Sequence, residues 1–188
     1  MSRRSSILAV PLLPLVLIAG CGGRTEVAPS ASFDPQEVVR VAVLVDQVQD
    51  TSGTRSPDVE AEISAVFTRA LLSKNYELAT AKIDQRDAQG INYLGSAARI
   101  SDAAALRFAG SAGASHALVI TMTADPRPRS EAEVRKPAAV SARLLDARMR
   151  SAVWSATHAE PSYVITPFDP RDAVREVAAK VADAIPKR

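Results

Sequence analysis

The chain has 188 residues, of which 47% are hydrophobic and 23% charged, as expected of a folded globular protein and not of a disordered one. Aromatic residues make up only 4%, and the formal net charge is only +2, so the composition gives no indication of nucleic-acid binding. The chain contains one cysteine, so no internal disulfide can form and the hydrophobic core alone must hold the fold together.

The first 20 residues have the layout of an export signal. Arg3 and Arg4 precede an uncharged run over residues 7–19, which is shorter than the roughly 20 residues that a membrane-spanning helix needs. The run ends in Ile-Ala-Gly before Cys21, which resembles the bacterial lipobox. That resemblance implies cleavage before Cys21 and a diacylglycerol on its sulfur. The alternative is an ordinary secretory peptide with an incidental thiol, and Sec export is favoured over the twin-arginine route.

The residues after the signal predict how the mature protein is held. Gly22 follows the cysteine where an aspartate would imply retention in the inner membrane, so the resemblance implies the outer membrane, facing the periplasm. Residues 1–20 hold two of the 23 basic residues and none of the 21 acidic ones, so the mature chain is formally neutral. Attachment must therefore come from the lipid. Residues 21–36 are small, polar and proline-containing and predict a flexible tether, and residues 37–188 predict one globular domain.

Hydrophobic periodicity predicts the elements of that domain. Residues 38–45 form an almost wholly apolar strand that we expect to be buried on both faces. The other predicted elements, in chain order, are a helix from Ser56-Pro57 to Lys74, a strand over 76–83, a helix capped by Ser101 that ends at Gly110 or Gly113, strands over 116–122, 137–145 and 152–159, and a final helix opening at Asp169-Pro170.

The element order is strand–helix–strand–helix–strand–strand–strand–helix, which predicts the α/β (α+β) class with a mixed five-stranded sheet covered by helices. Strands separated by helices should pair in parallel, and consecutive strands antiparallel. The predicted spatial order is 2-1-3-4-5, which makes the strands over 76–83 and 152–159 the outer ones.

Three stretches resemble a group of bacterial envelope proteins that includes the TolB amino-terminal domain, LpoB-like activators of penicillin-binding proteins and the CsgG-like curli secretion subunit. They are the helix-to-strand turn at Asn75-Tyr76, the strand start over 113–119 and the hairpin from Asp146 to Trp154. Here Asn75 and Ser115 replace the group's glycine and aspartate. Met149-Arg150 replaces its Thr-Gly turn, which predicts a different turn type or a small bulge.

The residues that could carry chemistry form no recognisable catalytic motif. His116 and His158, the only histidines, have no metal-ligand spacing, so we expect His116 to be structural and His158 solvated. Ser115 does not follow the strand–turn–helix order of a nucleophile elbow. Asp146 is expected to cap a turn. The sequence therefore predicts no enzyme, no cofactor and no metal.

These observations predict a non-catalytic envelope lipoprotein, an accessory or assembly component of an outer-membrane or periplasmic transport machine. The alternatives are a lipoprotein regulator of peptidoglycan synthesis and, in another class, a periplasmic enzyme. Expected partners are the membrane, through the lipid on Cys21, another envelope protein and, as an open possibility, further copies of the chain. Candidate partner-binding residues are Arg127 and Arg129 in one loop and Trp154, for which inward packing is the alternative.

Overall fold

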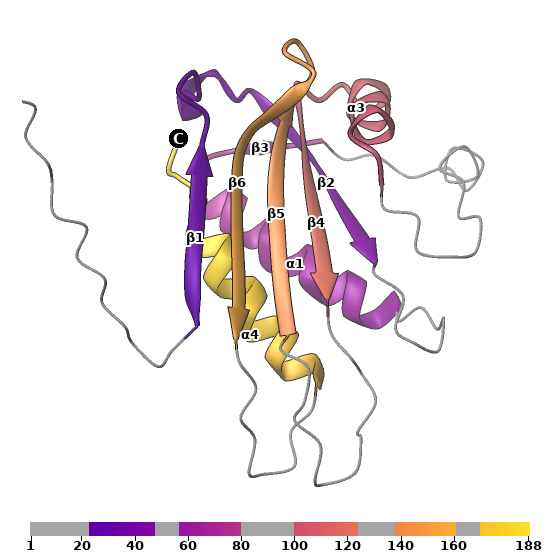
Figure 1. Cartoon of the computed structure of the whole chain (residues 1–188). Coiled ribbons are helices and arrows are strands. Elements are labelled where there is room, and N and C mark those ends of the chain that lie inside the picture. Colours follow the sequence, from indigo (N-terminus) through magenta and orange to yellow (C-terminus); the bar gives the residue numbers. More distant parts are fainter. Residues whose placement is uncertain (1–22, 48–56, 80–99, 124–137, 161–169) are drawn as a thin grey trace, which may run out of the picture.

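A computed structural model describes residues 23–47, 57–79, 100–123, 138–160 and 170–188 (Figure 1). Its centre is a mixed six-stranded sheet in the order β1-β6-β5-β4-β2-β3. The strands are β1 (Arg24–Pro29), β2 (Arg40–Gln47), β3 (Glu77–Leu78), β4 (His116–Thr123), β5 (Ala138–Asp146) and β6 (Ser151–Glu160). The strand β2 pairs in parallel with β3 and β4, and the remaining pairs are antiparallel.

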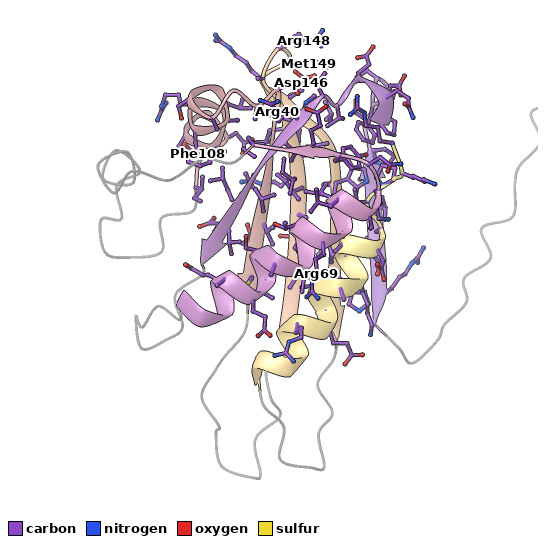
Figure 2. The ribbon with its side chains drawn as sticks, turned by 180° about the vertical axis from the view of Figure 1, so that it is seen from behind. Arg40, Arg69, Phe108, Asp146, Arg148 and Met149 are labelled. Carbon is purple, nitrogen blue, oxygen red and sulfur yellow. The ribbon has the colours of Figure 1, made fainter. Side chains whose placement is uncertain are left out.

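Helices cover both faces of this sheet. The helices α1 (Pro57–Ser73) and α4 (Pro170–Asp183) lie against each other and together cover one face, behind the sheet in Figure 1 and in front of it in Figure 2. The helix α3 (Asp102–Ser111) contacts β2, β4 and β5, and a short 3-10 helix, η1 (Pro35–Glu37), precedes β2. Among the described helices none is long and apolar enough to cross a membrane.

Two hydrophobic clusters form the core, one on each face of the sheet. In β2, Val41 belongs to the cluster under α1 and α4, whereas Ala42 and Leu44 belong to the cluster under α3. In β4, Leu118 and Ile120 face the first cluster and alternate with residues that face the second. Because successive side chains in a strand point to opposite faces, both strands need apolar residues at nearly every position. The prediction of a strand buried on both faces is confirmed, but the strand runs over Arg40–Gln47 and not over residues 38–45, and Val39 before it is 50% exposed.

The predicted α/β class and strand order are confirmed, but the predicted number of strands is wrong. The five predicted strands correspond to β2 to β6, and they lie side by side in the predicted order. The sixth strand, β1, pairs antiparallel with β6 from Arg24, opposite Ala159, to Pro29, opposite Trp154.

The strand β1 corrects two further expectations. The predicted tether over residues 21–36 is wrong for residues 24–29, because they belong to the sheet, and Phe33 packs against the larger core cluster. The strand over 152–159 is not an outer strand, since β6 lies between β1 and β5. The other predicted outer strand does lie at an edge, although only Glu77–Leu78 of the predicted 76–83 are strand, and residues 80–83 lie outside the described residues.

Left-handed backbone conformations end two of the helices. In α1, the Tyr76 N–H donates to the Leu71 carbonyl, and Asn75, at φ +69°, sits where the envelope-protein group has glycine. In α3, the Ala114 N–H donates to the Ala109 carbonyl, and Gly113 has φ +66°. Both ends therefore have the six-to-one hydrogen bond and left-handed residue of a Schellman motif.

The turn between β5 and β6 has both features that were predicted as alternatives. Arg150 has φ +53°, a left-handed conformation that a glycine would adopt at less cost. The pairing register then shifts between Leu144, opposite Trp154, and Leu145, opposite Ala152, so Val153 is an extra residue in β6. This extra residue is a β-bulge.

Candidate functional site

A cluster of polar side chains lies at one end of the sheet, where β2 and β4 begin and β5 ends. Ser115 and His116 stand at the start of β4, Arg40 at the start of β2 and Asp146 at the end of β5. The sheet register brings them together, since His116 is opposite both Val41 and Asp146. Figure 2 shows Arg40, Asp146 and Arg148 gathered at this end of the molecule.

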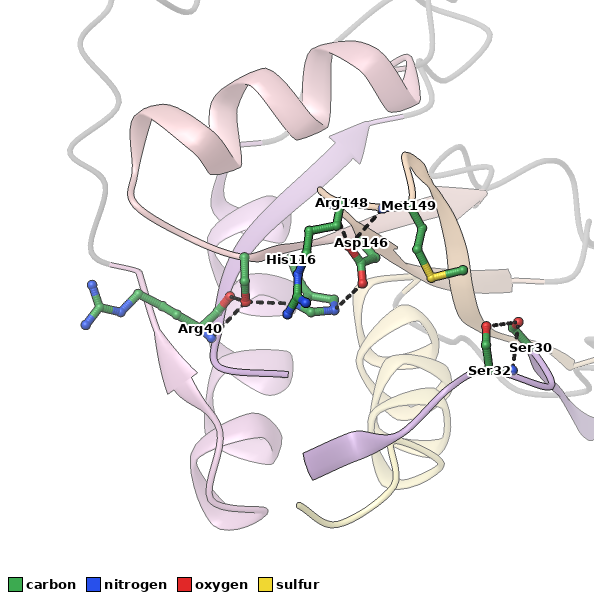
Figure 3. A network of polar contacts seen from close by, with 8 residues as sticks. Ser30, Ser32, Arg40, His116, Asp146, Arg148 and Met149 are labelled. Carbon is green, nitrogen blue, oxygen red and sulfur yellow. Dashed lines mark hydrogen bonds and ion pairs between the residues drawn. The ribbon is translucent and has the colours of Figure 1, made fainter. Parts of the chain in front are cut away.

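Hydrogen bonds and one close His–carboxylate contact connect the cluster in a chain (Figure 3). His116 lies between Ser115, whose Oγ is 2.8 Å from its Nδ1, and Asp146, whose Oδ2 is 3.5 Å from its Nε2. Ser115 Oγ also accepts from the Arg40 N–H at 3.2 Å and lies 3.1 Å from the Arg40 carbonyl oxygen. Asp146 Oδ1 accepts from the backbone N–H of Arg148 at 2.6 Å and of Met149 at 3.1 Å. The prediction that Asp146 caps the turn is confirmed.

The burial of His116 controls its ionisation. Its side chain is 3% exposed, and loss of hydration lowers its pKa below the usual range, although the neighbouring Asp146 carboxylate acts to raise it. When the ring is neutral, Ser115 can donate to Nδ1 while the Nε2–H faces Asp146. When the ring is protonated, Nδ1–H donates to Ser115, and Ser115 can donate to the Arg40 carbonyl instead. The network is therefore satisfied in either protonation state.

This arrangement resembles a catalytic Ser-His-Asp set only in its residue types. Ser115 Oγ is bonded to the backbone of Arg40, and His116 is almost completely buried. Nearby backbone donors are also in use, because the Ser115 N–H donates to the Arg40 carbonyl and the Ala147 N–H to the Ser115 carbonyl. An oxyanion site needs donors directed at the reacting atom. The geometry instead fits a polar clamp that joins β2, β4 and the β5–β6 turn.

His158 does not lie where the sequence predicted. It is 2% exposed, and its Nδ1 is 2.7 Å from the Thr25 hydroxyl on β1. Burial lowers its pKa, the nearby Lys180 on α4 lowers it further, and Glu176 acts to raise it. The expectation of a solvated histidine is wrong because β1 and α4 both cover this part of β6.

Trp154 packs inward, so the alternative in which it anchors a partner at the surface is contradicted. Its side chain is 3% exposed and belongs to the cluster under α1 and α4. Together with Phe33, Tyr76 and Ile185 it lines a small apolar hollow in that cluster.

The remaining predicted site residues, Cys21, Arg127 and Arg129, lie outside the described residues, so their roles stay predictions. No group of three or more His, Cys, Asp and Glu side chains within the described ranges is placed to hold a metal ion.

The fold is that of a mixed-sheet α/β domain, in which a parallel strand–helix–strand unit is followed by a long antiparallel hairpin. Solved structures share this architecture. The PelC dodecamer from Paraburkholderia phytofirmans matches with a TM-score of 0.53 at 17% identity, over 88% of this chain and 99% of that chain. At this identity the likeness shows the fold alone.

Two other solved structures match less closely. The LpoB C-terminal domain from Escherichia coli matches with a TM-score of 0.41 at 18% identity, over 64% of this chain and 82% of that chain. The lipoprotein GNA1162 from Neisseria meningitidis matches with a TM-score of 0.43 at 20% identity, over 78% of this chain and 99% of that chain. LpoB-like proteins are one of the groups that the sequence motifs resemble. No protein-family model matches the chain, and no curated protein matches it in sequence.

Proposed function

We propose that this chain is a non-catalytic lipoprotein of the bacterial envelope that works by binding other proteins as an accessory or assembly component of a transport machine. The observation that carries the proposal is the position of β1, which begins at Arg24, three residues after the predicted lipidated Cys21. Three extended residues span about 10 Å. The domain is then held against the outer membrane and not at the end of a long tether.

This short reach separates the proposal from the regulator of peptidoglycan synthesis. Proteins of that type usually have a long disordered segment with which to cross the periplasm. Residues 22–36 would reach about 50 Å if all were extended, but because β1 belongs to the sheet only about 10 Å of free chain remains before the domain. The polar clamp at His116 also supports a binding protein over an enzyme, because its groups are bonded to one another and to the backbone.

Self-association is part of the proposal. The solved structure with the highest TM-score among those compared above is described as a dodecamer, and the fold it shares with this chain supports the proposal that copies of this chain also assemble. Binding of a second, different envelope protein remains compatible with such an assembly.

Metabolic labelling with radioactive palmitate tests the anchor. The full chain should incorporate label and remain in the outer-membrane fraction, whereas Cys21→Ser should lose both label and membrane retention. Affinity capture of the full chain from detergent-solubilised envelopes, followed by mass spectrometry, tests the partner. Recovery of an unmodified thiol on a chain that begins before residue 21 would overturn the proposal, and so would hydrolase activity lost on Ser115→Ala in a folded protein.

A further inference from the structure

The outer edge of β1 is open among the described residues. The strand stands first in the sheet order and pairs only with β6. The Ser30 N–H donates to the Val153 carbonyl at 2.8 Å, so the backbone groups of residue 30 point toward β6. Backbone groups alternate in direction along an antiparallel strand, so those of Thr25 and Val27 point away from β6. These N–H and C=O groups form the free edge.

Apart from the charges of Arg24 and Glu26, the edge has few of the features with which proteins block strand pairing. The register of β1 on β6 runs without a bulge from Arg24 to Pro29, and β1 has no lysine. Pro29 lacks an outward N–H but stands at the last position of the strand. The strand is exposed along most of its length, and Val27 is 46% exposed. An edge of this kind accepts another strand.

The charges on β1 indicate which strand would pair with this edge. Arg24 and Glu26 flank Thr25 and point to the same face, because they are two residues apart. We propose that two copies of this chain join by antiparallel pairing of their β1 strands about a two-fold axis at Thr25. Arg24 of each copy then lies opposite Glu26 of the other, which makes two reciprocal ion pairs, and a two-fold interface is self-complementary in this way.

Other registers of the same pairing fit less well. An axis at Glu26 places the two Glu26 side chains opposite each other, and an axis at Arg24 does the same for the two arginines, so like charges meet in both. An axis at Val27 places Thr25 opposite Pro29, which has no N–H to donate. With the axis at Thr25, the outward groups of Gly23 and Val27 also pair, and every outward donor in that stretch has a partner.

The inference deepens the proposed function, since it names the surface through which copies assemble, but the pairing itself does not need the lipid. The two proposals can therefore fail separately. Loss of palmitate labelling would contradict the anchor and leave the strand pairing unaffected.

Cysteine crosslinking in the full chain tests the register. Antiparallel hydrogen-bonded pairs have Cα atoms about 5.5 Å apart, within the range of a disulfide. Thr25→Cys should therefore give a covalent dimer on oxidation of whole cells. Ala28→Cys is the control on the same strand, because it is the more exposed of the two positions but its two copies would lie about 20 Å apart. The parent chain should give no dimer. A dimer of the parent would show that Cys21 is a free thiol, which contradicts the anchor and not the pairing.

Charge exchange provides a test that does not use Thr25. Arg24→Glu and Glu26→Arg, each alone, should weaken association of the detergent-purified full chain about tenfold, measured by analytical ultracentrifugation. The double variant R24E/E26R restores opposite charges in the proposed register and should recover the parent affinity. Pairing of β1 with a different edge of the second copy would not predict this recovery, so a double variant as weak as the singles overturns the proposal.

Proline substitutions distinguish the outward backbone groups of β1 from those that pair with β6, because each proline removes one backbone N–H. Val27→Pro removes an outward N–H and should abolish the dimer with little change in melting temperature. Glu26→Pro removes an N–H directed at β6 and should lower the melting temperature. Unchanged dimerisation of Val27→Pro, or equal crosslinking of Thr25→Cys and Ala28→Cys, would overturn the proposal.

Discussion

At the scale of single residues, the two histidines are the groups whose ionisation should control stability near neutral pH. His116 and His158 are both buried, and burial lowers the pKa of each below the value in the unfolded chain. The unfolded chain therefore binds more protons as the pH falls below about 6.5. The stability that each neutral histidine provides is complete above that pH and is lost as the pH falls through the lower pKa of the folded state.

The free energy of unfolding of the full chain, measured with denaturant, should therefore fall between pH 7.5 and pH 5.5. His116→Gln and His158→Gln should each reduce that fall, even where they lower stability at pH 7.5. The comparison uses the change with pH within each variant, so a constant loss of packing does not affect it. A fall of undiminished size in the double variant would contradict this assignment.

The glycine at the end of α3 allows a second prediction at this scale. A Cβ added at Gly113 or Gly110 meets no atom within 4 Å beyond the adjacent chain and the helix's own backbone, so the backbone conformation decides the effect of alanine at either position. Gly113 has φ +66°, where alanine should cost about 1–2 kcal/mol, whereas Gly110 is helical and alanine there should add up to about 1 kcal/mol. Thermal melting of the two variants should show shifts of opposite sign. Shifts of the same sign would contradict the Schellman end of α3.

At the scale of elements, the side chain of Lys74, the residue that follows α1, binds the C-terminal end of α4. Lys74 Nζ donates to the Asp183 carbonyl at 2.8 Å and to the Ile185 carbonyl at 2.5 Å. The Asp183 carbonyl lies at the C-terminal end of α4, which carries partial negative charge, and Ile185 follows two residues after that end. Tyr76 adds a bond from its hydroxyl to the Pro186 carbonyl. The C-terminal segment is thus attached to the turn between α1 and β3.

Lys74→Met should lower the free energy of unfolding by about 1–2 kcal/mol, because two charge-assisted bonds are lost while the aliphatic part of the side chain is kept. Lys180→Met is the matched control, since Lys180 makes a surface ion pair with Glu176 one helical turn away that should be worth less than about 0.5 kcal/mol. Denaturant titration measures both. Equal losses in the two variants would argue against a stabilising role for Lys74 at the end of α4.

The elements also show how far the sequence predicts the fold. The strands β2 and β4 are apolar on both faces, and α4 has a clear apolar stripe. These patterns are strong enough to predict the fold class and the order of the strands in the sheet. The strand β1 has no such pattern, since five of its six residues are exposed and it is held mainly by backbone bonds to β6. Backbone pairing of an exposed polar segment leaves no periodicity to detect.

Most of the errors follow from that one strand. A prediction that lacks β1 makes the strand over 152–159 an outer strand, leaves His158 in solvent and assigns residues 24–29 to a tether. The polar clamp was missed for a different reason. The cluster comes from three separate parts of the sequence, and only the register of β2, β4 and β5 brings Arg40, the adjacent pair Ser115-His116 and Asp146 together. The turn-capping role of Asp146 is local, and for that reason it could be predicted.

At the scale of the whole molecule, the proposed anchor and β1 together fix the distance of the domain from the membrane. A flexible Gly/Ser segment of about 20 residues between Gly22 and Gly23 should keep lipidation and stability but raise the mean distance by about 25 Å. If partners are bound beside the membrane, complementation of a deletion strain should fall. The same segment added after Arg188 is the control and should leave complementation intact. Full complementation by the chain with the internal spacer would contradict a function that depends on closeness to the membrane.

The position of β1 also bears on how often copies meet. A domain of this size is about 40 Å across, so a slack of about 10 Å confines every copy to a layer one molecule thick. Within that layer copies diffuse in two dimensions, and their local concentration far exceeds the average over the cell. Two copies anchored in one leaflet can share a two-fold axis only along the membrane normal. Pairing through β1 would then lay both sheets along the bilayer.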